Sequence, residues 1–319
     1  PCSPSETKAK MINILFAACP EQFSRYERHL TRCLKQEGIT ANLTTSCAPA
    51  DVDYLVYAPN SALRDFSPYT RCKAVLSLWA GVETIVSNKS LTQPLCRMVD
   101  KGLRQGMIEW VTGHTLRYHL GMDKHIVNSG QIWDEANPPL AQHRPVTILG
   151  MGALGSSCGQ ALAQLGFPVT GWSRSPKAIE DITCHNGPEG LKKALQTAQI
   201  LILLLPDTPQ TENIMNTNTL AQMPKGSVII NSGRGPLIDD KALLESLDQG
   251  HISAACLDVF RIEPLPKDHP YWTLPNVTVT PHIASGTRTV TAAEVVVENI
   301  ARGEQGLPFL YLVDRTLGY

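Results

Sequence analysis

Short apolar runs alternate with amphipathic stretches along most of this chain. Apolar runs of about four to eight residues predict buried strands, and stretches with helical periodicity between them predict helices. Helices are expected at 21–36 and 289–302, and strands at 11–18, 54–57, 74–78, 146–149, 168–172, 200–205, 227–231, 254–259 and 277–280. This alternation is typical of α/β proteins with mostly parallel sheets.

The alternation is interrupted once. Residues 107–128 contain no proline and predict a long helix, whereas Asn137, Pro138 and Pro139 break any helix that would follow. A second α/β series begins at Val146. Since a chain of 319 residues is too long for one ordinary core, we expect two domains, with the first ten residues as an extension outside them.

Composition narrows the kind of partner. The formal net charge is -1 and 18% of the residues are charged, which indicates neither a nucleic-acid surface nor an acidic tail. No apolar run approaches the roughly 20 residues of a membrane span, and residues 1–10 lack the pattern of a signal peptide. The nine cysteines include no Cys-x-x-Cys pair and the nine histidines show no metal spacing, so no metal is expected. We expect a cytoplasmic protein that binds small molecules.

A glycine-rich turn carries the first chemical signal. In VTILGMGALGSSCGQALAQLG, an apolar strand is followed by Gly150, Gly152 and Gly155 and then by a helix of small residues. Gly150 permits a tight turn, Gly152 lets the backbone approach a pyrophosphate, and Gly155 allows close packing of helix on strand. The helix N-terminus would then face the phosphates. The turn therefore predicts a dinucleotide site formed by Gly150, Met151, Gly152, Ala153, Leu154 and Gly155.

The end of the next strand bears on which dinucleotide binds. An acid at this place holds the ribose 2′-hydroxyl of NAD, whereas basic residues favour the 2′-phosphate of NADP. Here the chain reads GWSRSPK, with Ser173, Arg174 and Lys177 and no carboxylate before Glu180. Arginine can bind a phosphate bidentately, and serine can hydrogen-bond it without repulsion. NADP is favoured, with NAD as the alternative.

Longer motifs resemble a known family. The run NSGRGPLIDDKALLESLDQGHISAACLDVFRIEPLP, followed by LPNVTVTPHIAS, resembles the D-isomer-specific 2-hydroxyacid dehydrogenase family, and LLLPDTPQTENIMN and the glycine turn extend the match. Within that family, SLWAGVE, GWSRS and VDRTLGY are similar to glyoxylate/hydroxypyruvate reductases of the bacterial A type. The resemblance implies two doubly wound parallel-sheet domains. A Rossmann cofactor domain at 102–283 would be inserted into a flavodoxin-like substrate domain formed by 1–101 and 284–319.

The resemblance also implies the catalytic residues. Reduction of a 2-oxo acid requires a proton for the carbonyl oxygen and a fixed cation for the carboxylate. His282, after Pro281 at a strand end, would be the general acid, and Glu263 would favour its protonated form and orient the ring. Arg234, between two glycines, would bind the substrate carboxylate and polarise the carbonyl.

Further contacts follow from the same match. Asp258 would hold the nicotinamide carboxamide. The remaining cofactor contacts expected are Leu205, Pro206, Thr211, Ser232, Gly233 and Ser285, and the substrate would meet Trp79, Ala80, Gly81, Arg234 and His282. Trp79 departs from the small residue common in the family, which puts the size of the substrate in doubt. Trp133 corresponds to a region that reaches into a partner subunit in related reductases, and the family habit is a homodimer.

Three functions remain open. The first is NADPH-dependent reduction of a small 2-oxo acid, glyoxylate or hydroxypyruvate, to the 2-hydroxy acid, glycolate or D-glycerate. The second is an NAD-linked dehydrogenase for D-lactate or 3-phosphoglycerate, which the absence of an acid near Ser173 disfavours. The third is a non-catalytic, dinucleotide-sensing corepressor, a role that some relatives of this fold have while keeping the same three residues.

Overall fold

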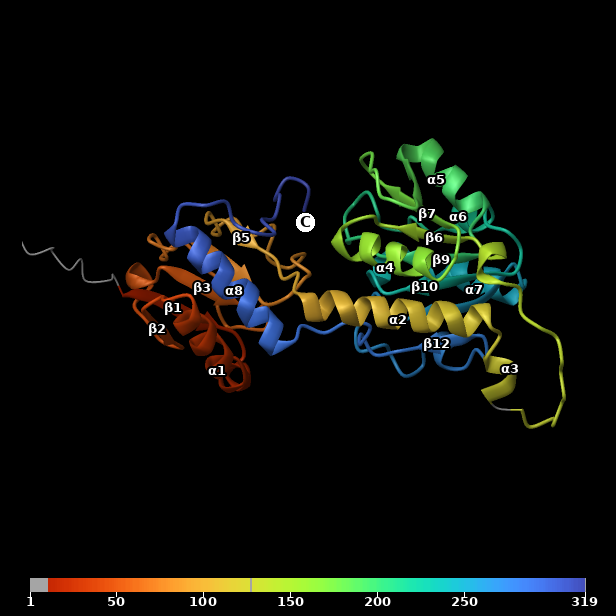
Figure 1. Cartoon of the computed structure of the whole chain (residues 1–319), viewed down its shortest axis with the longest axis horizontal. Coiled ribbons are helices and arrows are strands. Elements are labelled where there is room, and N and C mark those ends of the chain that lie inside the picture. The colour runs from red at the N-terminus through yellow and green to blue at the C-terminus, as the bar shows by residue number, and fades with distance from the viewer. Residues whose placement is uncertain (1–10, 127, 319) are drawn as a thin grey trace, which may run out of the picture. The chain divides into compact units, whose positions relative to one another are not determined.

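The computed structural model describes residues 11–126 and 128–318 (Figure 1). The chain divides into two compact units. The first unit comprises the residues up to Leu103 together with those from Thr287 onward, and the second unit is Arg104–Gly286. The sequence-based boundaries, 101 and 283, lie two residues (103 − 101) and three residues (286 − 283) from these divisions. Each unit is built around its own parallel sheet.

The first unit has a five-stranded sheet. Its strands lie in the order β2 (Ala41–Thr44), β1 (Ile12–Ala17), β3 (Tyr54–Tyr57), β4 (Ala74–Ser77) and β5 (Leu95–Cys96), all parallel. Helices α1 (Pro20–Gln36) and α8 (Thr289–Glu304) pack together on one face (Figure 1). The order 2-1-3-4-5 is that of flavodoxin-like folds. Helix α8, from the C-terminal part of the chain, thus belongs to the same unit as β1, from the N-terminal part.

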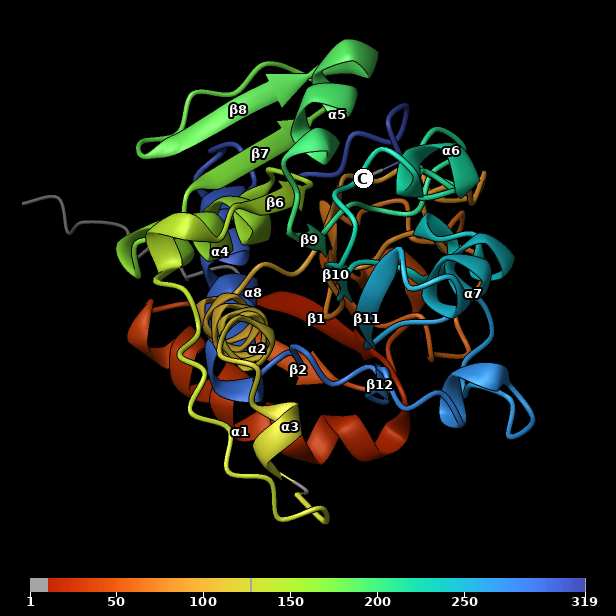
Figure 2. The ribbon, with the colours of Figure 1, turned by 90° about the vertical axis from the view of Figure 1, so that its right-hand side faces the viewer.

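The second unit has a seven-stranded parallel sheet, which Figure 2 shows with β8 at its top. The order is β12 (Val277–Val279), β11 (Ile252–Leu257), β10 (Ser227–Asn231), β9 (Ile200–Leu203), β6 (Val146–Leu149), β7 (Val169–Ser173) and β8 (Ile182–Asn186). Helices α2 (Lys101–His119) and α4 (Ala153–Gln164) contribute to the core on one face, and α5 (Gly187–Gln196), α6 (Thr217–Leu220) and α7 (Asp240–Asp248) to that on the other. This is the Rossmann order, with a switch point between β6 and β9. The predicted fold class is confirmed.

The remaining elements are short. They are the helix α3 (Asp123–Ile126) and the 3₁₀ turns η1 (Pro49–Asp51), η2 (Ala141–His143), η3 (Gly235–Leu237) and η4 (Pro270–Trp272).

The long helix predicted at 107–128 is wrong at both ends. α2 begins earlier because Asp100 Oδ1 accepts hydrogen bonds from the backbone N–H groups of Gly102 and Leu103 and so caps the helix. It ends at His119 because Gly121 adopts a left-handed backbone, with φ 62°, which a helix cannot continue through.

The elements that the sequence pattern did not predict include one edge strand of each sheet. β2 and β8 each lie at an edge, so their residues are only partly buried and form no continuous apolar run. The strand predicted at 254–259 is also displaced, since β11 covers Ile252–Leu257. Asp258 therefore lies directly after β11, at the start of a loop, where its side chain can bond residues of neighbouring loops.

Candidate active site

The predicted residues of the second unit gather at one edge of its sheet. Because the strands are parallel, their carboxyl ends lie on the same side, which is where ligands bind in open α/β sheets. Gly150 follows β6, Ser173 ends β7, Leu205 lies two residues beyond β9, and Ser232, Asp258 and His282 come shortly after β10, β11 and β12.

In the glycine turn, backbone atoms lie so close to Gly150 and Gly155 that neither position has room for a side chain. Gly150 has φ 113°, and a Cβ there would lie 2.6 Å from the carbonyl of Leu204. A Cβ on Gly155 would lie 1.8 Å from the Gly150 carbonyl oxygen, so only a glycine at position 155 lets α4 pack this close to the turn. Gly152 differs, since a Cβ would meet nothing within 4 Å among the described residues. No side chain in the described part of the chain caps α4, whose first turn therefore keeps its N–H groups for a ligand.

Ser173 is placed beside that turn. Leu149 and Trp172 are register partners in β6 and β7, and the Gly150 N–H donates to the Trp172 carbonyl at 2.8 Å, so Ser173 is level with the glycine turn. The Ser173 hydroxyl donates to the Ser175 carbonyl at 2.7 Å, which bends the chain after β7. Arg174 and Lys177 are exposed on the loop that follows.

The loop after β9 is held by Thr211. The buried Thr211 hydroxyl donates to the Pro206 carbonyl at 2.7 Å and lies 2.9 Å from the Thr208 backbone N–H, which donates to it. Leu205 is buried at the start of this loop. Thr211 thus shapes the wall that the cofactor was expected to contact.

The loop that carries Arg234 is fixed by Asn231, which sequence reasoning missed. The Asn231 side chain accepts from the Gly233 N–H at 3.1 Å and donates to the Arg234 carbonyl at 3.0 Å. A Cβ on Gly235 would lie 2.0 Å from the Phe260 carbonyl carbon, so this loop and the one after β11 touch through their backbones. An asparagine that ends a fully buried strand is the signal that could have revealed this role.

Ser232 stands out within the same loop. It is 6% exposed, and its buried hydroxyl has no hydrogen-bond partner among the described residues. A buried, unsatisfied hydroxyl costs free energy unless a ligand or water completes it. The predicted cofactor contact at Ser232 would give this hydroxyl the partner that it lacks among the described residues.

Glu263 and His282 meet, although 19 residues separate them. His282 Nδ1 lies 2.7 Å from Glu263 Oε2, with the two side chains 50% and 37% exposed. The other carboxylate oxygen, Oε1, accepts from the Phe260 N–H at 2.9 Å, which orients the carboxylate. Because the carboxylate accepts at Nδ1, the Nε2 nitrogen is the one that remains to exchange a proton.

Asp258 clamps the segment that carries His282. It is 1% exposed, and its carboxylate accepts from the Thr280 hydroxyl at 2.6 Å and from the N–H groups of Ile283 and Ala284, each at 2.9 Å. The His282 N–H donates to the Asp258 carbonyl at 2.9 Å. The predicted contact of Asp258 with a carboxamide is untested, but a role in holding His282 is visible. Thr280 was missed.

The remaining predicted residues lie elsewhere. Ser285 packs against α2, since a Cβ on Gly106 would lie 3.0 Å from its hydroxyl. In the first unit, Trp79, Ala80 and Gly81 follow β4, and the Trp79 side chain is exposed. The Ser77 hydroxyl donates to the Trp79 carbonyl and accepts from the Trp79 N–H, each at 3.1 Å, which fixes this turn.

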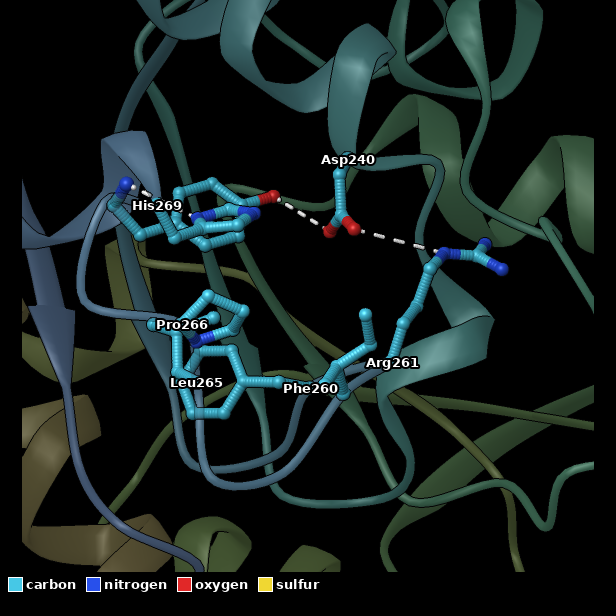
Figure 3. Close-up of a pocket in the computed structure, with 8 residues that line it drawn as sticks. Asp240, Phe260, Arg261, Leu265, Pro266 and His269 are labelled. Atoms are coloured by element: carbon cyan, nitrogen blue, oxygen red, sulfur yellow. Dashed lines mark hydrogen bonds and ion pairs between the residues drawn. The ribbon is translucent and has the colours of Figure 1, made fainter.

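A pocket of about 130 Å³ lies beside the loop that carries Glu263 (Figure 3). Its walls are residues 260–262 and 265–266 with Asp240, His269 and Tyr271. Burial, and then the nearby Asp240 carboxylate, raise the pKa of Tyr271. None of the three predicted catalytic side chains, all within the described residues, lines this pocket.

Burial shifts the pKa values of two neighbouring groups, the Cys256 thiol and the His114 imidazole. Burial raises the pKa of the Cys256 thiol to about 12, and burial is also the main cause that lowers the pKa of His114, 3.3 Å away. The eight cysteines in the described ranges are all free thiols. Within those ranges, no His, Cys, Asp and Glu side chains cluster in a way that could hold a metal ion, and no helix is both long and apolar enough for a bilayer.

Comparisons with known proteins agree on one family. Residues 114–284 match the sequence model described as D-isomer specific 2-hydroxyacid dehydrogenase, NAD binding domain. Glyoxylate/hydroxypyruvate reductase A of Yersinia enterocolitica is 38% identical over 279 residues, which cover 85% of this chain and 88% of that protein. The protein of the same name from Serratia proteamaculans is 36% identical over 298 residues, 91% of this chain and 94% of that protein.

Solved structures give the same result. A D-isomer specific 2-hydroxyacid dehydrogenase from Xanthobacter autotrophicus, in complex with NADPH and MES, is 35% identical with a TM-score of 0.90, over 96% of this chain and 99% of that one. An NADPH-dependent glyoxylate/hydroxypyruvate reductase from Sinorhizobium meliloti, in complex with NADP and sulfate, is 33% identical with a TM-score of 0.84, over 97% of this chain and 100% of that one.

Proposed function

This chain belongs to the D-isomer-specific 2-hydroxyacid dehydrogenase family, and we propose that it reduces glyoxylate and hydroxypyruvate with NADPH, by means of Arg234, Glu263 and His282. The family resemblance drawn from the sequence is thereby confirmed, and the chain is an NAD(P)-dependent oxidoreductase. The products would be glycolate and D-glycerate.

The contact between His282 and Glu263 carries the proposal. The 2.7 Å contact of Nδ1 with Oε2 orients the imidazole ring, so that Nε2 is the nitrogen that would give the carbonyl oxygen its proton. The Arg234 guanidinium would bind the substrate carboxylate and draw electron density from the carbonyl. In the reverse direction, His282 would accept the proton of the hydroxyl group.

The residues present fit a dinucleotide. The open position at Gly152, the uncapped first turn of α4 within the described chain and the orphaned Ser232 hydroxyl suit a pyrophosphate and its ribose. A bound nicotinamide would supply the hydride that adds to the carbonyl carbon. We propose that Gly150–Gly155, Leu205, Pro206, Thr211, Ser232, Gly233, Asp258 and Ser285 line this site.

NADPH is proposed over NADH because of the residues after β7. Ser173 is level with the glycine turn, Arg174 and Lys177 are exposed on the loop that follows, and the sequence from Ser173 to Ile179 holds no carboxylate that would repel a 2′-phosphate. Two of the similar structures were solved with NADPH or NADP. Trp79, Ala80 and Gly81 are proposed to meet the substrate.

A homodimer is proposed as the working state. Residues 120–140 expose several large apolar side chains that the chain itself does not cover, namely Leu120, Met122, Ile126, Ile132, Trp133 and Leu140, and Trp133 is 88% exposed. Burial of such a segment against a second copy would remove this apolar surface from water. Light scattering of the purified protein tests the dimer. The cytoplasmic location stays a prediction, which cell fractionation tests.

One assay tests the reaction. The purified protein is given a panel of 2-oxo acids with NADPH and with NADH, and loss of the reduced cofactor is followed. We expect the highest kcat/KM with glyoxylate or hydroxypyruvate and NADPH. Higher values with NADH, or with pyruvate or 3-phosphohydroxypyruvate, would favour the NAD-linked dehydrogenase. No turnover of any acid, despite cofactor binding, would favour the corepressor.

A further inference from the structure

Arg261 links the loop that carries Glu263 to the loop that carries Arg234. The proposed reaction needs these two side chains at fixed positions relative to each other. Its Nη2 donates to the Ile238 carbonyl at 2.7 Å and to the Pro236 carbonyl at 3.3 Å. Pro236 lies in the η3 turn, which starts directly after Arg234, and Ile238 is the C-cap of that turn. The backbone of Arg261 is itself two residues before Glu263. One side chain therefore links the loop of the anion-binding arginine to the loop of the carboxylate.

Several further contacts orient this guanidinium. Nη2 also donates to Asn213 Oδ1, and Nη1 lies 3.6 Å from Glu212 Oε1. Nε lies 3.6 Å from Asp240 Oδ2, while the other oxygen of Asp240 accepts from the Tyr271 hydroxyl at 2.9 Å (Figure 3). The Arg261 side chain is 32% exposed, so its charge-assisted hydrogen bonds are partly shielded from water. The planar fork of arginine suits this set of acceptors, and a lysine ammonium could satisfy only part of it.

Steric contact makes the link stiff. At Gly235 the two loops already touch, with the Phe260 carbonyl carbon where a Cβ would be. Arg261 is the residue after this contact, and the Phe260 N–H holds Glu263 Oε1 at 2.9 Å. A shift of the η3 turn would therefore move the Glu263 carboxylate, and with it the His282 ring.

We propose that Arg261 is a positioning residue, which sets Glu263, and through it the His282 imidazole, relative to Arg234. The inference rests on the proposed function, since it gives those three residues their roles. Arg261 itself need not touch substrate or cofactor. The competing view is that Arg261 only stabilises the fold.

A double-mutant cycle separates the two views. Arg261→Met is made alone and together with Glu263→Gln, and kcat, KM and the Kd of NADPH are measured. We expect Arg261→Met alone to lower kcat about tenfold, since a small displacement of catalytic groups is costly, with NADPH affinity changed less than about twofold. In the Glu263→Gln background the same change should alter kcat by less than about twofold, because the residue that Arg261 positions is already disabled.

Arg261→Lys and Arg302→Met complete the series. Lysine should recover part of the lost kcat, because it can still bond one carbonyl. Arg302 is the matched control in the first unit, with 28% of its side chain exposed, Nε donating to the Pro308 carbonyl at 2.6 Å and Nη1 3.6 Å from Glu298. Arg302→Met should leave kcat unchanged. If Arg261→Met does not fold, the same cycle is run with Arg261→Lys, with a smaller expected loss of about threefold that again vanishes in the Glu263→Gln background.

The outcomes are distinguishable from those of the proposed function. If the wild-type protein turns over no 2-oxo acid, the proposed function fails, and the inference is read instead from the proton NMR resonance of the His282 Nδ1–H. That resonance should broaden or vanish in Arg261→Met and persist in Arg302→Met. An unchanged kcat and resonance in Arg261→Met, or an equal loss of kcat in both backgrounds, would overturn the positioning role.

Discussion

Two regions at one sheet edge of the second unit are held by different forces. The turn from Gly150 to Gly155 depends on missing side chains at its two ends, because backbone atoms lie within 2.6 Å of where a Cβ on Gly150 or Gly155 would be. The edge formed by the loops after β10, β11 and β12 depends on hydrogen bonds, in which Asn231, Asp258 and Arg261 hold the backbone and side chains of their neighbours. A Cβ added where backbone atoms are in close contact forces the backbone to move. Removal of one side chain from a hydrogen-bond network leaves the other hydrogen bonds in place.

The difference matches the work proposed for each region. A pyrophosphate is bound by backbone N–H groups, so the turn needs a fixed main chain and few side chains. Proton transfer depends on the orientation of particular side chains, which hydrogen bonds provide. Substitutions should therefore lower cofactor affinity in the first region, and should change turnover or substrate binding more than cofactor affinity in the second.

The largest expected effect is at His282, the proposed proton donor. His282→Asn, which suits the left-handed backbone at this position, should lower kcat by about a thousandfold, within the range found for loss of a general acid, while the Kd of NADPH stays within about twofold. Steady-state kinetics and fluorescence titration measure the two quantities. A comparable loss of NADPH affinity would mean that the two regions are not separable.

Next in size is a pair of glycine substitutions. Gly155→Ala places a Cβ 1.8 Å from the Gly150 carbonyl oxygen, which should cost about 3 kcal/mol of unfolding free energy, lower the Tm by about 6–12 °C and weaken NADPH binding about a hundredfold. Gly152→Ala meets no atom within 4 Å in the described chain, so its Tm should stay near that of the wild type while NADPH binding weakens. Thermal melts and titrations compare the pair. Equal Tm values for both variants would contradict the steric account.

A smaller effect is expected at the loop after β7. Arg174→Asp replaces the charge that is proposed to bind the 2′-phosphate by a repelling one, and the loss of a charge-assisted hydrogen bond of about 2 kcal/mol corresponds to about a thirtyfold fall in the preference for NADPH over NADH. The ratio of kcat/KM for the two cofactors measures it, and Lys177→Asp on the same loop shows how much comes from general charge. An unchanged preference in Arg174→Asp would remove this loop from the account of cofactor choice.

The smallest expected effect is at Asn231. Asn231→Ala removes the acceptor of the Gly233 N–H and leaves the Arg234 carbonyl with the longer bond from the Leu237 N–H, which should cost about 2 kcal/mol of stability and raise the KM for the 2-oxo acid about fivefold as Arg234 loosens. Asn231→Asp keeps the acceptor for the Gly233 N–H, so its stability and its KM should lie between those of the wild type and those of Asn231→Ala. Should Asn231→Ala alter kcat but not KM, Asn231 would act on something other than Arg234.

The same contrast explains what the sequence could predict. The glycine turn is local, and its residues are consecutive, so strand, turn and helix could be read together. Arg234, Glu263 and His282 were found because motifs around them resemble a family. That Glu263 and His282 meet is a matter of tertiary structure, and their contact was expected from the resemblance rather than from their spacing.

The supporting residues could not be predicted in this way. Asn231 and Thr280 look like ordinary polar residues at strand ends, and Arg261 looks like a solvated loop arginine. Asn231 bonds backbone groups of its own loop, Thr280 bonds the Asp258 carboxylate, and Arg261 bonds carbonyls of another loop, and no sequence pattern encodes these contacts. Edge strands β2 and β8 were missed for a related reason, because half-exposed strands lack a continuous apolar run.

The backbone of His282 limits how this site can evolve. Its φ is 54°, a left-handed conformation that asparagine, aspartate, histidine and glycine tolerate better than other residues. A lysine, tyrosine or cysteine that arose at position 282 could in principle donate a proton, but each would pay roughly 1–3 kcal/mol of backbone strain before any chemistry began. Substitutions in the loops around His282, which could change the substrate, are therefore tolerated more readily than a replacement of His282, the proposed acid.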